Sequence, residues 1–172
     1  MKNVYRMAWS LAGAATALGL ALWLVFPPAS PFLLASIGGT TVFLFGLTRA
    51  PAAQPRALFG GHLGGAAIGI FCTKTFGNSL WVYVLSCVMT LTLMLVTKTM
   101  HPPAGATPLI MVQTHASWHA MWQPVGLSIL ILVAVAAIWT RLGPKMVRYP
   151  VKWLDRSPPT IWWGNWEDGE DV

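Results

Sequence analysis

The hydrophobic positions of this chain form long runs rather than an alternating pattern. Met7–Phe26 holds twenty residues without a charge, which at about 1.5 Å per residue is long enough to cross a hydrocarbon core about 30 Å thick. The pattern predicts an all-α fold, a polytopic transmembrane helical bundle with four to six membrane segments. The further apolar segments are Phe32–Leu47, Ala57–Thr73, Leu80–Thr97, Ala104–Gln113 and Val125–Trp139.

Two of these segments are short for a full membrane crossing. Ala104–Gln113 has ten residues and contains Gly105 and Pro108, so we expect a half-helix or a re-entrant piece there. Phe32–Leu47 carries Gly38-Gly39-Thr40-Thr41 at its middle, which predicts an unwound turn. Because irregular backbone at membrane depth is tolerated only where it faces protein or water, both segments are expected to line a pathway.

The order of the segments suggests an internal repeat. A long apolar helix runs into Pro27-Pro28-Ala29, and a short Gly-containing segment, a polar loop and another helix follow. The same order recurs from Leu80 through Pro102-Pro103-Ala104, seventy-five residues further on. Interrupted short segments in matching places of two halves point to a binding site in membrane transporters.

The composition places this bundle in a bilayer and restricts its cargo. Hydrophobic residues make up 55% of the 172 residues and charged residues only 9%, against roughly 25% charged in a soluble domain. Residues 1–154 contain no Asp or Glu. A cation site inside a membrane normally needs a carboxylate, so an anion or a neutral solute is the expected cargo. The five acids are Asp155, Glu167, Asp168, Glu170 and Asp171.

The basic residues predict the topology. If all six segments cross, one side of the membrane carries every basic residue of residues 1–154 except Lys74, in agreement with the positive-inside bias. With four crossings and two re-entrant pieces, Arg49, Arg56 and Lys98 would face outside. The charges therefore favour six crossings in the cell inner (plasma) membrane, with both termini cytoplasmic. We divide the chain into a transmembrane domain, 1–140, and a basic, then acidic, Trp-rich cytoplasmic tail, 141–172.

The stretch from Thr97 to Thr107 carries the clearest candidate chemistry. Proline is favoured at the first position of a helix, and a helix opening at Pro102 or Pro103 would direct free backbone N–H groups towards His101 and Lys98. Such a helix terminus can bind an anion. The alternative is a capped turn between two helices with a lysine reaching to the membrane surface.

This stretch also resembles a known family. His101-Pro102-Pro103, within the run His-Pro-Pro-Ala-Gly-Ala-Thr, is similar to the motif that gives the HPP family of bacterial and plastid integral membrane proteins its name. A second block resembles the same family: Phe45-Gly46, then Ala-Pro-Ala-Ala-Gln-Pro-Arg over 50–56, then Gly61-His62. The resemblance covers about residues 7–140 and implies four membrane helices. The chain departs from the family pattern at Ala57-Leu58, at Pro108 and at Gln113-Thr114-His115.

The resemblance implies transport. Family members in photosynthetic organisms are regarded as nitrite carriers, and most bacterial members have no settled substrate. We therefore expect a permease or channel-like facilitator for a small monovalent anion such as nitrite, and not an enzyme. No cofactor, metal site or nucleic-acid partner is expected; the expected partners are membrane lipids and a small inorganic anion. The predicted substrate-binding residues are His101, Pro102, Pro103, Gly105, Thr107, Gln54, Arg56, His62 and Lys98.

Arg56 has two interpretations. Its forked guanidinium could bind two oxygens of a planar oxyanion such as nitrite, nitrate or bicarbonate. It could equally anchor the topology at the membrane surface. A third feature of this region, the small residues Gly61, Gly65 and Gly69, predicts close helix packing. The partner helix could lie within the chain or in a second subunit, and we expect a homo-oligomer through this helix.

The histidines leave other functions open. His115 and His119 stand four residues apart, a spacing that can bind a metal, although no carboxylate or cysteine completes the set. One alternative is a membrane redox or metal subunit that uses His62, His101, His115 and His119 as ligands. Another is a structural subunit of a membrane complex.

Overall fold

A computed structural model describes residues 2–25, 31–143 and 145–158 of the chain. The regular elements of these residues are all helical, which confirms the all-α prediction. They are α1 (Lys2–Val25), α2 (Pro31–Gly46), the 3₁₀ turn η1 (Pro51–Ala53), α3 (Pro55–Phe76), α4 (Leu80–Thr97), the 3₁₀ turn η2 (Pro102–Gly105), α5 (Ala106–Gln113), the π-helical segment η3 (Met121–Gly126) and α6 (Leu127–Leu142). The first Pro-Pro-Ala, at 27–29, lies outside the described residues.

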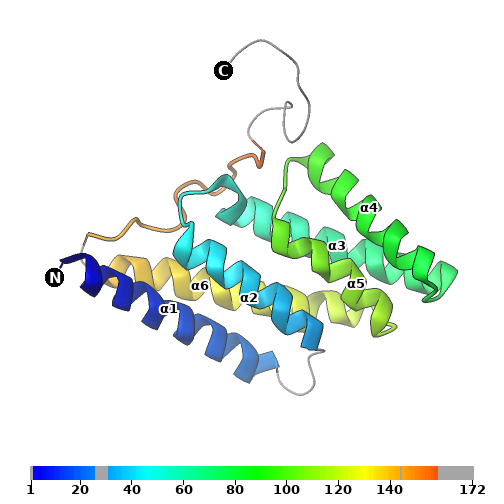
Figure 1. Ribbon diagram of the computed structural model, residues 1–172, viewed down its shortest axis with the longest axis horizontal. Coiled ribbons are helices and arrows are strands. Elements are labelled where there is room, and N and C mark those ends of the chain that lie inside the picture. Colours follow the sequence, from blue (N-terminus) through cyan, green and yellow to red (C-terminus); the bar gives the residue numbers. More distant parts are fainter. Residues whose placement is uncertain (1, 26–30, 144, 159–172) are drawn as a thin grey trace, which may run out of the picture.

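Successive helices run in opposite directions along the long axis of the molecule (Figure 1). The amino terminus, the loop between α2 and α3, the junction between α4 and α5, and the segment after α6 therefore lie towards one end, which we call the basic end. This order of directions is that of the six-crossing arrangement. Three helices of the described residues are long and apolar enough to cross a membrane: Asn3–Val25, Leu80–Thr97 and Met121–Leu142.

The short elements are shorter than a crossing, as predicted. α2 has 16 residues, or about 24 Å at 1.5 Å per residue. α5 has only 8 residues, with η2 before it. Large apolar side chains on the outer surfaces of the long helices are exposed, including Leu11 at 62%, Leu80 at 82% and Val96 at 76%. Such surfaces suit lipid and not water.

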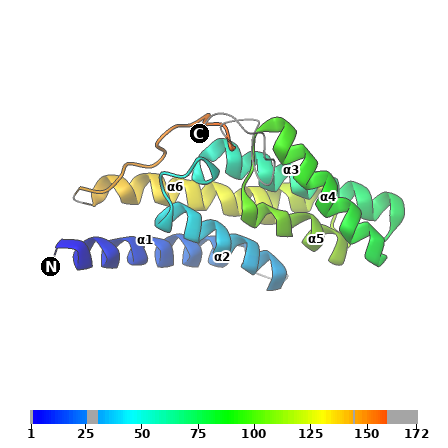
Figure 2. The ribbon, with the colours of Figure 1, turned by 45° about the horizontal axis from the view of Figure 1, so that its top comes forward.

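The six helices form two groups. α1 packs against α2 and α6, and these three form the first group; α3 packs against α4 and α5, and these form the second group (Figures 1 and 2). α2 joins the groups by packing against η2 and α5, and η3 joins them by packing against α3. The chain can be divided into two repeats, α1–α3 and α4–α6. The first group then combines α1 and α2 of the first repeat with α6 of the second, and the second group combines α4 and α5 of the second repeat with α3 of the first. α1 and α4 run in opposite directions, so the matching halves are inverted.

The glycines of α3 face other helices of the same chain. A Cβ atom at Gly61 would lie 3.0 Å from Ala104 Cβ, and one at Gly69 would lie 2.7 Å from the carbonyl oxygen of Pro108. Small residues therefore let α3 approach η2 and α5 closely, as predicted from their spacing. Because this face is buried within the chain, a homo-oligomer, which stays a prediction, would have to use another surface.

The unwound turn predicted in α2 is wrong. Pro31–Gly46 is one continuous α-helix through Gly38-Gly39-Thr40-Thr41. A regular helix satisfies its own backbone hydrogen bonds at membrane depth, and Gly39 has a packing role instead. A Cβ atom at Gly39 would lie 3.1 Å from Pro103 Cβ, so the missing side chain lets α2 lie directly against η2.

Residues 145–158 fold back over the basic end towards α3 (Figure 2). The buried amide of Gln54 donates to the carbonyl oxygens of Thr48 and Ala50, at 2.9 and 3.1 Å. Its oxygen accepts hydrogen bonds from the backbone N–H groups of Val151 and Lys152, at 2.9 and 3.2 Å. The described part of the tail is therefore attached to the bundle. The acids and tryptophans beyond residue 158 lie outside the described residues.

A histidine–hydroxyl cluster between the helix groups

Five polar side chains meet where the two helix groups touch, and we call them the histidine–hydroxyl cluster. Its members are Ser36, Thr40, His62, His101 and Thr107, each at most 2% exposed. His62 Nε2 and His101 Nε2 lie 2.9 and 3.0 Å from the same atom, Thr40 Oγ1. His62 Nδ1 lies 2.9 Å from Thr107 Oγ1, which is 3.4 Å from Ser36 Oγ.

Each element brings its member for a local reason. Ser36 and Thr40 are four residues apart on α2, so they share one helix face. His62 projects from α3 beside Gly61, where α3 and η2 approach closely. This approach brings the imidazoles of His62 and His101 together, with ring centroids 5.1 Å apart. His101 is the last extended residue before η2, with φ −134° and ψ 100°, and the two prolines after it begin the helical turn.

Backbone carbonyls close both ends of the cluster. His101 Nδ1 lies 2.7 Å from the carbonyl oxygen of Ala52, and Ser36 Oγ donates to the carbonyl oxygen of Pro103 at 2.9 Å. A carbonyl oxygen only accepts, so His101 Nδ1 must carry a hydrogen. The neutral form of His101 then has an accepting Nε2, and the single hydrogen of the Thr40 hydroxyl can be directed at it or at the carbonyl oxygen of Ser36, each 3.0 Å from Thr40 Oγ1.

The structure brings together some of the predicted site residues. His62, His101 and Thr107 belong to the cluster, and Pro103 contributes its carbonyl oxygen. His101 and Thr107 are fully buried, each 0% exposed. Pro102 is exposed and Gly105 is half-buried, and both are next to cluster residues in sequence.

Three other predicted residues lie at the basic end and not in the cluster. Gln54 holds the loop and the tail as described above. Arg56 donates from Nη2 to the carbonyl oxygen of Thr97 at 2.7 Å, at the end of α4, where a cation is favoured by the helix dipole. Its Nε is buried, and the described residues give it no hydrogen-bond partner. Lys98 ends α4 in the left-handed conformation, with φ 57°.

The helix after His101 begins where the prolines predicted, but its first amides are engaged. The N–H of Ala104 donates to the carbonyl oxygen of His101 at 2.9 Å, and the N–H of Ala106 reaches back to Pro103 and Ala104. A 3₁₀ turn uses these groups, so η2 does not present a row of free N–H groups to His101. Side chains, not helix amides, form the polar site here.

Sequence reasoning missed Ser36 and Thr40. The available signal was two hydroxyls at a spacing of four in an apolar segment, which predicts one polar stripe on a helix. The glycines of this segment are its more conspicuous feature, but they serve packing: Gly39 lies against Pro103, whereas Ser36 and Thr40 make the hydrogen bonds of the cluster. Nothing local indicates that Thr40 contacts two histidines 22 and 61 positions away.

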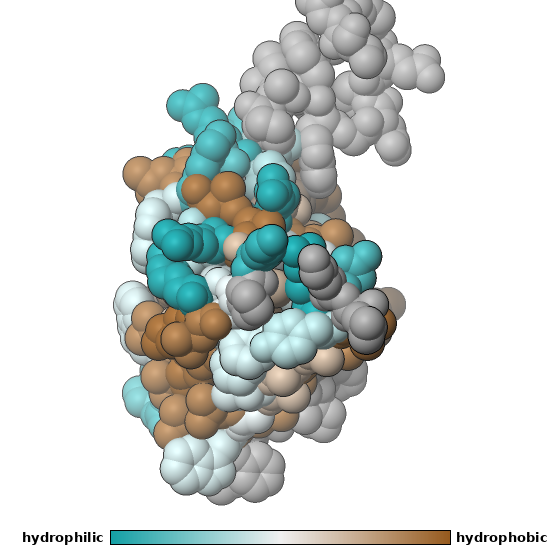
Figure 3. Space-filling model, turned by 90° about the vertical axis from the view of Figure 1, so that its left-hand side faces the viewer, coloured by the Kyte–Doolittle hydropathy of each residue, from teal (hydrophilic) through white to brown (hydrophobic). Residues whose placement is uncertain are grey.

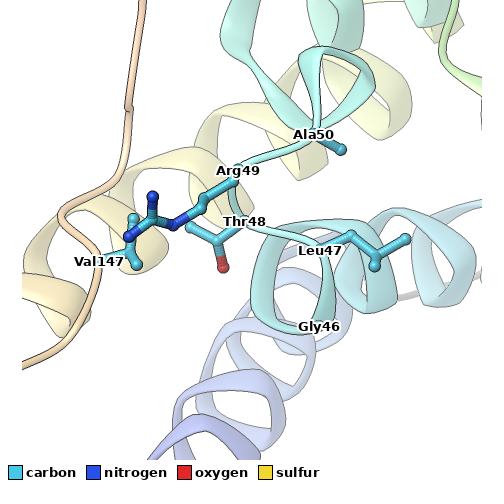
Figure 4. A pocket seen from close by; sticks show the side chains of 6 residues that line it. All are labelled: Gly46, Leu47, Thr48, Arg49, Ala50 and Val147. Atoms are coloured by element: carbon cyan, nitrogen blue, oxygen red, sulfur yellow. The ribbon is translucent and has the colours of Figure 1, made fainter.

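Two pockets at the basic end carry cations. One, of about 370 Å³, is lined by residues 46–50 and Val147, and the side chain of Arg49 extends across it towards Val147 (Figure 4). The other, of about 280 Å³, includes Arg6 and Lys145 in its lining. Hydrophilic side chains gather across the upper half of this end of the molecule (Figure 3). The one ion pair of the described residues joins Lys152 to Asp155 at 3.9 Å.

The remaining histidines, His115 and His119, lie at the end of the molecule opposite the basic end. His115 is exposed and accepts or donates a hydrogen bond with Asn78 at 3.0 Å, and His119 is also exposed. Across the part of the chain that the structure describes, no three His, Cys, Asp or Glu side chains gather as metal ligands would.

Comparison with known proteins agrees with the motifs. The family model described as "HPP, transmembrane region" matches residues 1–150. One transmembrane protein of Dictyostelium discoideum is 32% identical over 130 residues, which cover 71% of this chain and 42% of the relative. A second from the same organism is 30% identical over 139 residues, covering 76% and 45%. The chain spans less than half the length of these relatives, and no solved structure matches it.

Proposed function

The chain belongs to the HPP transmembrane family, and we propose that it is a permease or channel-like facilitator for a small monovalent anion such as nitrite, with the histidine–hydroxyl cluster in its transport path. The observation that carries the proposal is the cluster itself. Ionisable side chains inside a membrane bundle are costly and usually face the protein interior at transport sites. Here two histidines and three hydroxyls are gathered at the contact between two inverted helix groups, where transporters of repeated architecture hold their substrate.

The charge of the chain supports an anion as the cargo. Residues 1–154 have no Asp or Glu, so the bundle offers no carboxylate to a cation. The basic end has Arg6, Arg49 and Lys145 around its pockets, and cations around a mouth raise the local concentration of anions. The cluster behind them supplies imidazole and hydroxyl groups that can donate hydrogen bonds to an oxyanion.

The cluster is closed in this conformation, so transport requires it to open. We propose that the two helix groups separate at the contact between α2 and η2, which exposes His101 to the basic end. Rigid movement of one half against the other around a fixed site is the usual form of alternating access. We place the basic end at the cytoplasmic side of the inner membrane, where the positive-inside bias puts it.

Flux into liposomes that contain only this chain tests the proposal. The panel is nitrite, nitrate, formate and bicarbonate, with protein-free liposomes to measure passive leak. His62→Ala and His101→Ala should lower the flux by roughly tenfold or more, because a hydrogen bond to a charged group contributes about 1.5–3 kcal/mol. His115→Ala is the matched control, since its imidazole is exposed at the other end, and it should keep wild-type flux. Wild-type flux no greater than the leak for all four anions would overturn the proposal.

A further inference from the structure

We infer that the hydroxyl of Thr40 relays a proton between His101 and His62, so that the chain moves one proton together with each monovalent anion. This inference rests on the proposed function and concerns the same cluster. It follows from counting the hydrogens that the observed contacts can hold. The distances from Thr40 Oγ1 to the two Nε2 atoms, 3.0 and 2.9 Å, are both hydrogen-bond distances.

The hydrogens of the neutral cluster can be arranged so that both contacts between Thr40 and the histidines are filled, with the Thr40 hydroxyl turned from the Ser36 carbonyl oxygen towards His101. His101 donates from Nδ1 to the Ala52 carbonyl, and Thr40 donates to His101 Nε2. The hydroxyl of Thr40 has a single hydrogen, so His62 must donate to it from Nε2. His62 Nδ1 is then an acceptor, and Thr107 donates to it. His101 is thus the Nδ1–H tautomer and His62 the Nε2–H tautomer.

In this arrangement, two of the close contacts between oxygen atoms have no hydrogen between them. One is the 3.4 Å contact between Ser36 Oγ and Thr107 Oγ1, because Ser36 donates to the Pro103 carbonyl and Thr107 donates to His62. The other is the 3.0 Å contact of Thr40 Oγ1 with the carbonyl oxygen of Ser36. The heavy atoms are therefore already arranged to bind one more proton. When one more proton is added, a hydrogen can be placed in either of these two contacts, and every donor in the cluster still has an acceptor.

The extra proton has a place on either histidine. On His101, both ring nitrogens donate, to Ala52 and to Thr40, while Thr40 donates to His62. On His62, both ring nitrogens donate, to Thr40 and to Thr107, and Thr107 donates to Ser36. The step between them is balanced: the Nε2 proton of His101 passes to Thr40 Oγ1 as the proton of Thr40 passes to His62 Nε2. No heavy atom needs to move.

The surroundings leave the two histidines as the groups that bind this proton. Around them, α2 contributes hydroxyls and Phe43, whose ring centroid is 5.3 Å from that of His101. α4 contributes Met94, which lies on the Gly61 side of α3, and η1 contributes the Ala52 carbonyl. The charged groups nearest in sequence are Arg56, which donates to the carbonyl oxygen of Thr97, and Lys98.

The charge of the proton explains the pairing with an anion. A protonated imidazole provides the positive charge that a buried monovalent anion requires, and this bundle has no carboxylate in residues 1–154 to neutralise it instead. His101 is bonded to the loop at the basic end, and Thr107 lies on α5, which runs away from that end (Figure 1). The relay therefore extends along the direction of transport.

The experiment measures proton and anion movement together, in liposomes that hold a pH-sensitive dye. The probes are nitrite and nitrate, and the leak is subtracted with protein-free liposomes. In the wild type we expect internal acidification with anion uptake, at one proton per anion and without dependence on membrane potential. Thr40→Val should lower the coupled flux roughly tenfold or more, on the scale at which positioned proton-transfer groups act. Thr40→Ser keeps the hydroxyl and should retain the coupled flux.

The matched control is Thr41→Val. Thr41 is the neighbouring buried hydroxyl of α2, and it donates only to its own helix, to the Ile37 carbonyl at 2.9 Å; this variant should behave as the wild type. Anion uptake without acidification, unchanged in Thr40→Val, would overturn the relay and leave the proposed function standing. If the wild type moves no anion, nitrogen NMR of the purified protein decides the relay. An Nε2–H tautomer of His101 in the neutral protein would contradict it.

Discussion

The two helix groups are held together by different kinds of contact. In the second group, α3 meets α5 through backbone, since a Cβ atom at Gly69 would lie 2.7 Å from the Pro108 carbonyl oxygen. In the first group, α1 meets α6 through aromatic side chains. The rings of Trp9 and Trp139 stack with centroids 4.9 Å apart, and each ring N–H donates to the backbone carbonyl of the other residue.

This difference indicates which of the two groups can change its packing. Backbone contacts at glycine have no rotamer through which to relax, whereas aromatic side chains can shift. Both histidines of the cluster stand on the second group, on α3 and immediately before η2, and the hydroxyls of Ser36 and Thr40 stand on α2 of the first group. The second group is therefore a rigid support for the imidazoles. The first group is the part whose movement would open the cluster.

The largest effect is expected from breaking the hydrogen bonds by which Gln54 attaches the tail to the loop before α3. Gln54→Leu leaves Thr48 O, Ala50 O and two tail N–H groups without their buried partner. A typical intramolecular hydrogen bond contributes about 0.5–1.5 kcal/mol, so we expect the loss of these four part-buried bonds to cost a few kcal/mol and to release residues 145–158. Thermal unfolding in detergent and limited proteolysis of the tail measure the two consequences.

Gln113→Leu is the control for this variant. Gln113 is exposed and accepts one hydrogen bond, from the hydroxyl of Tyr83 at 2.7 Å. Its replacement should change stability little, because water can take the place of the amide. Equal losses of stability in the two variants would mean that the four hydrogen bonds of Gln54 contribute no more than the one of Gln113.

The next effect compares the two packing modes directly. Gly69→Ala should destabilise the protein by about 1–3 kcal/mol, as overpacking of a filled contact does, because the Pro108 backbone cannot move aside. Gly13→Ala should cost less, since its new Cβ would meet the rings of Trp139 and Phe45. Gly19→Ala has nothing within 4 Å and serves as the reference. Thermal unfolding of the three variants ranks them; a larger loss for Gly13→Ala would reverse the assignment of the rigid group.

A smaller effect should follow from widening the contact between the groups. Gly39→Ala places a Cβ atom 3.1 Å from Pro103 Cβ, whereas Gly38→Ala meets nothing within 4 Å. We expect Gly39→Ala to push α2 from η2 by a few tenths of an ångström. A strain of about 1 kcal/mol would lower anion flux about fivefold. Flux assays at matched protein content check this, and identical flux in the two alanine variants would separate transport from the α2–η2 contact.

The smallest effect concerns the basic end. Arg49→Gln removes one exposed cation from the pocket in Figure 4. We expect anion flux to fall about two- to threefold at low ionic strength and less at high salt, because salt screens charges that act on an anion before it binds. Lys74→Gln, near the opposite end of the bundle, is the matched control. A loss that does not depend on salt would indicate a structural role for Arg49.

The features that depend on local pattern follow from the sequence alone. Long apolar runs specify helices in lipid, because every backbone group must be satisfied within the segment. The prolines after His101 determined where η2 begins, because proline is favoured at the first position of a helix. The distribution of basic residues anticipated that the loops before α3 and after α4 lie at the same end.

The site itself depends on how the whole helices pack together. Thr40 contacts residues 22 and 61 positions away, and no periodicity of α2 encodes those distances. The role of Gln54 likewise depends on a tail almost a hundred residues later, at Val151 and Lys152. A hydrogen bond requires two partners at about 3 Å, and the partner of a buried polar group is chosen by the packing of whole helices. The sequence shows that a buried polar group will need a hydrogen-bond partner, but it does not show which residue that partner is.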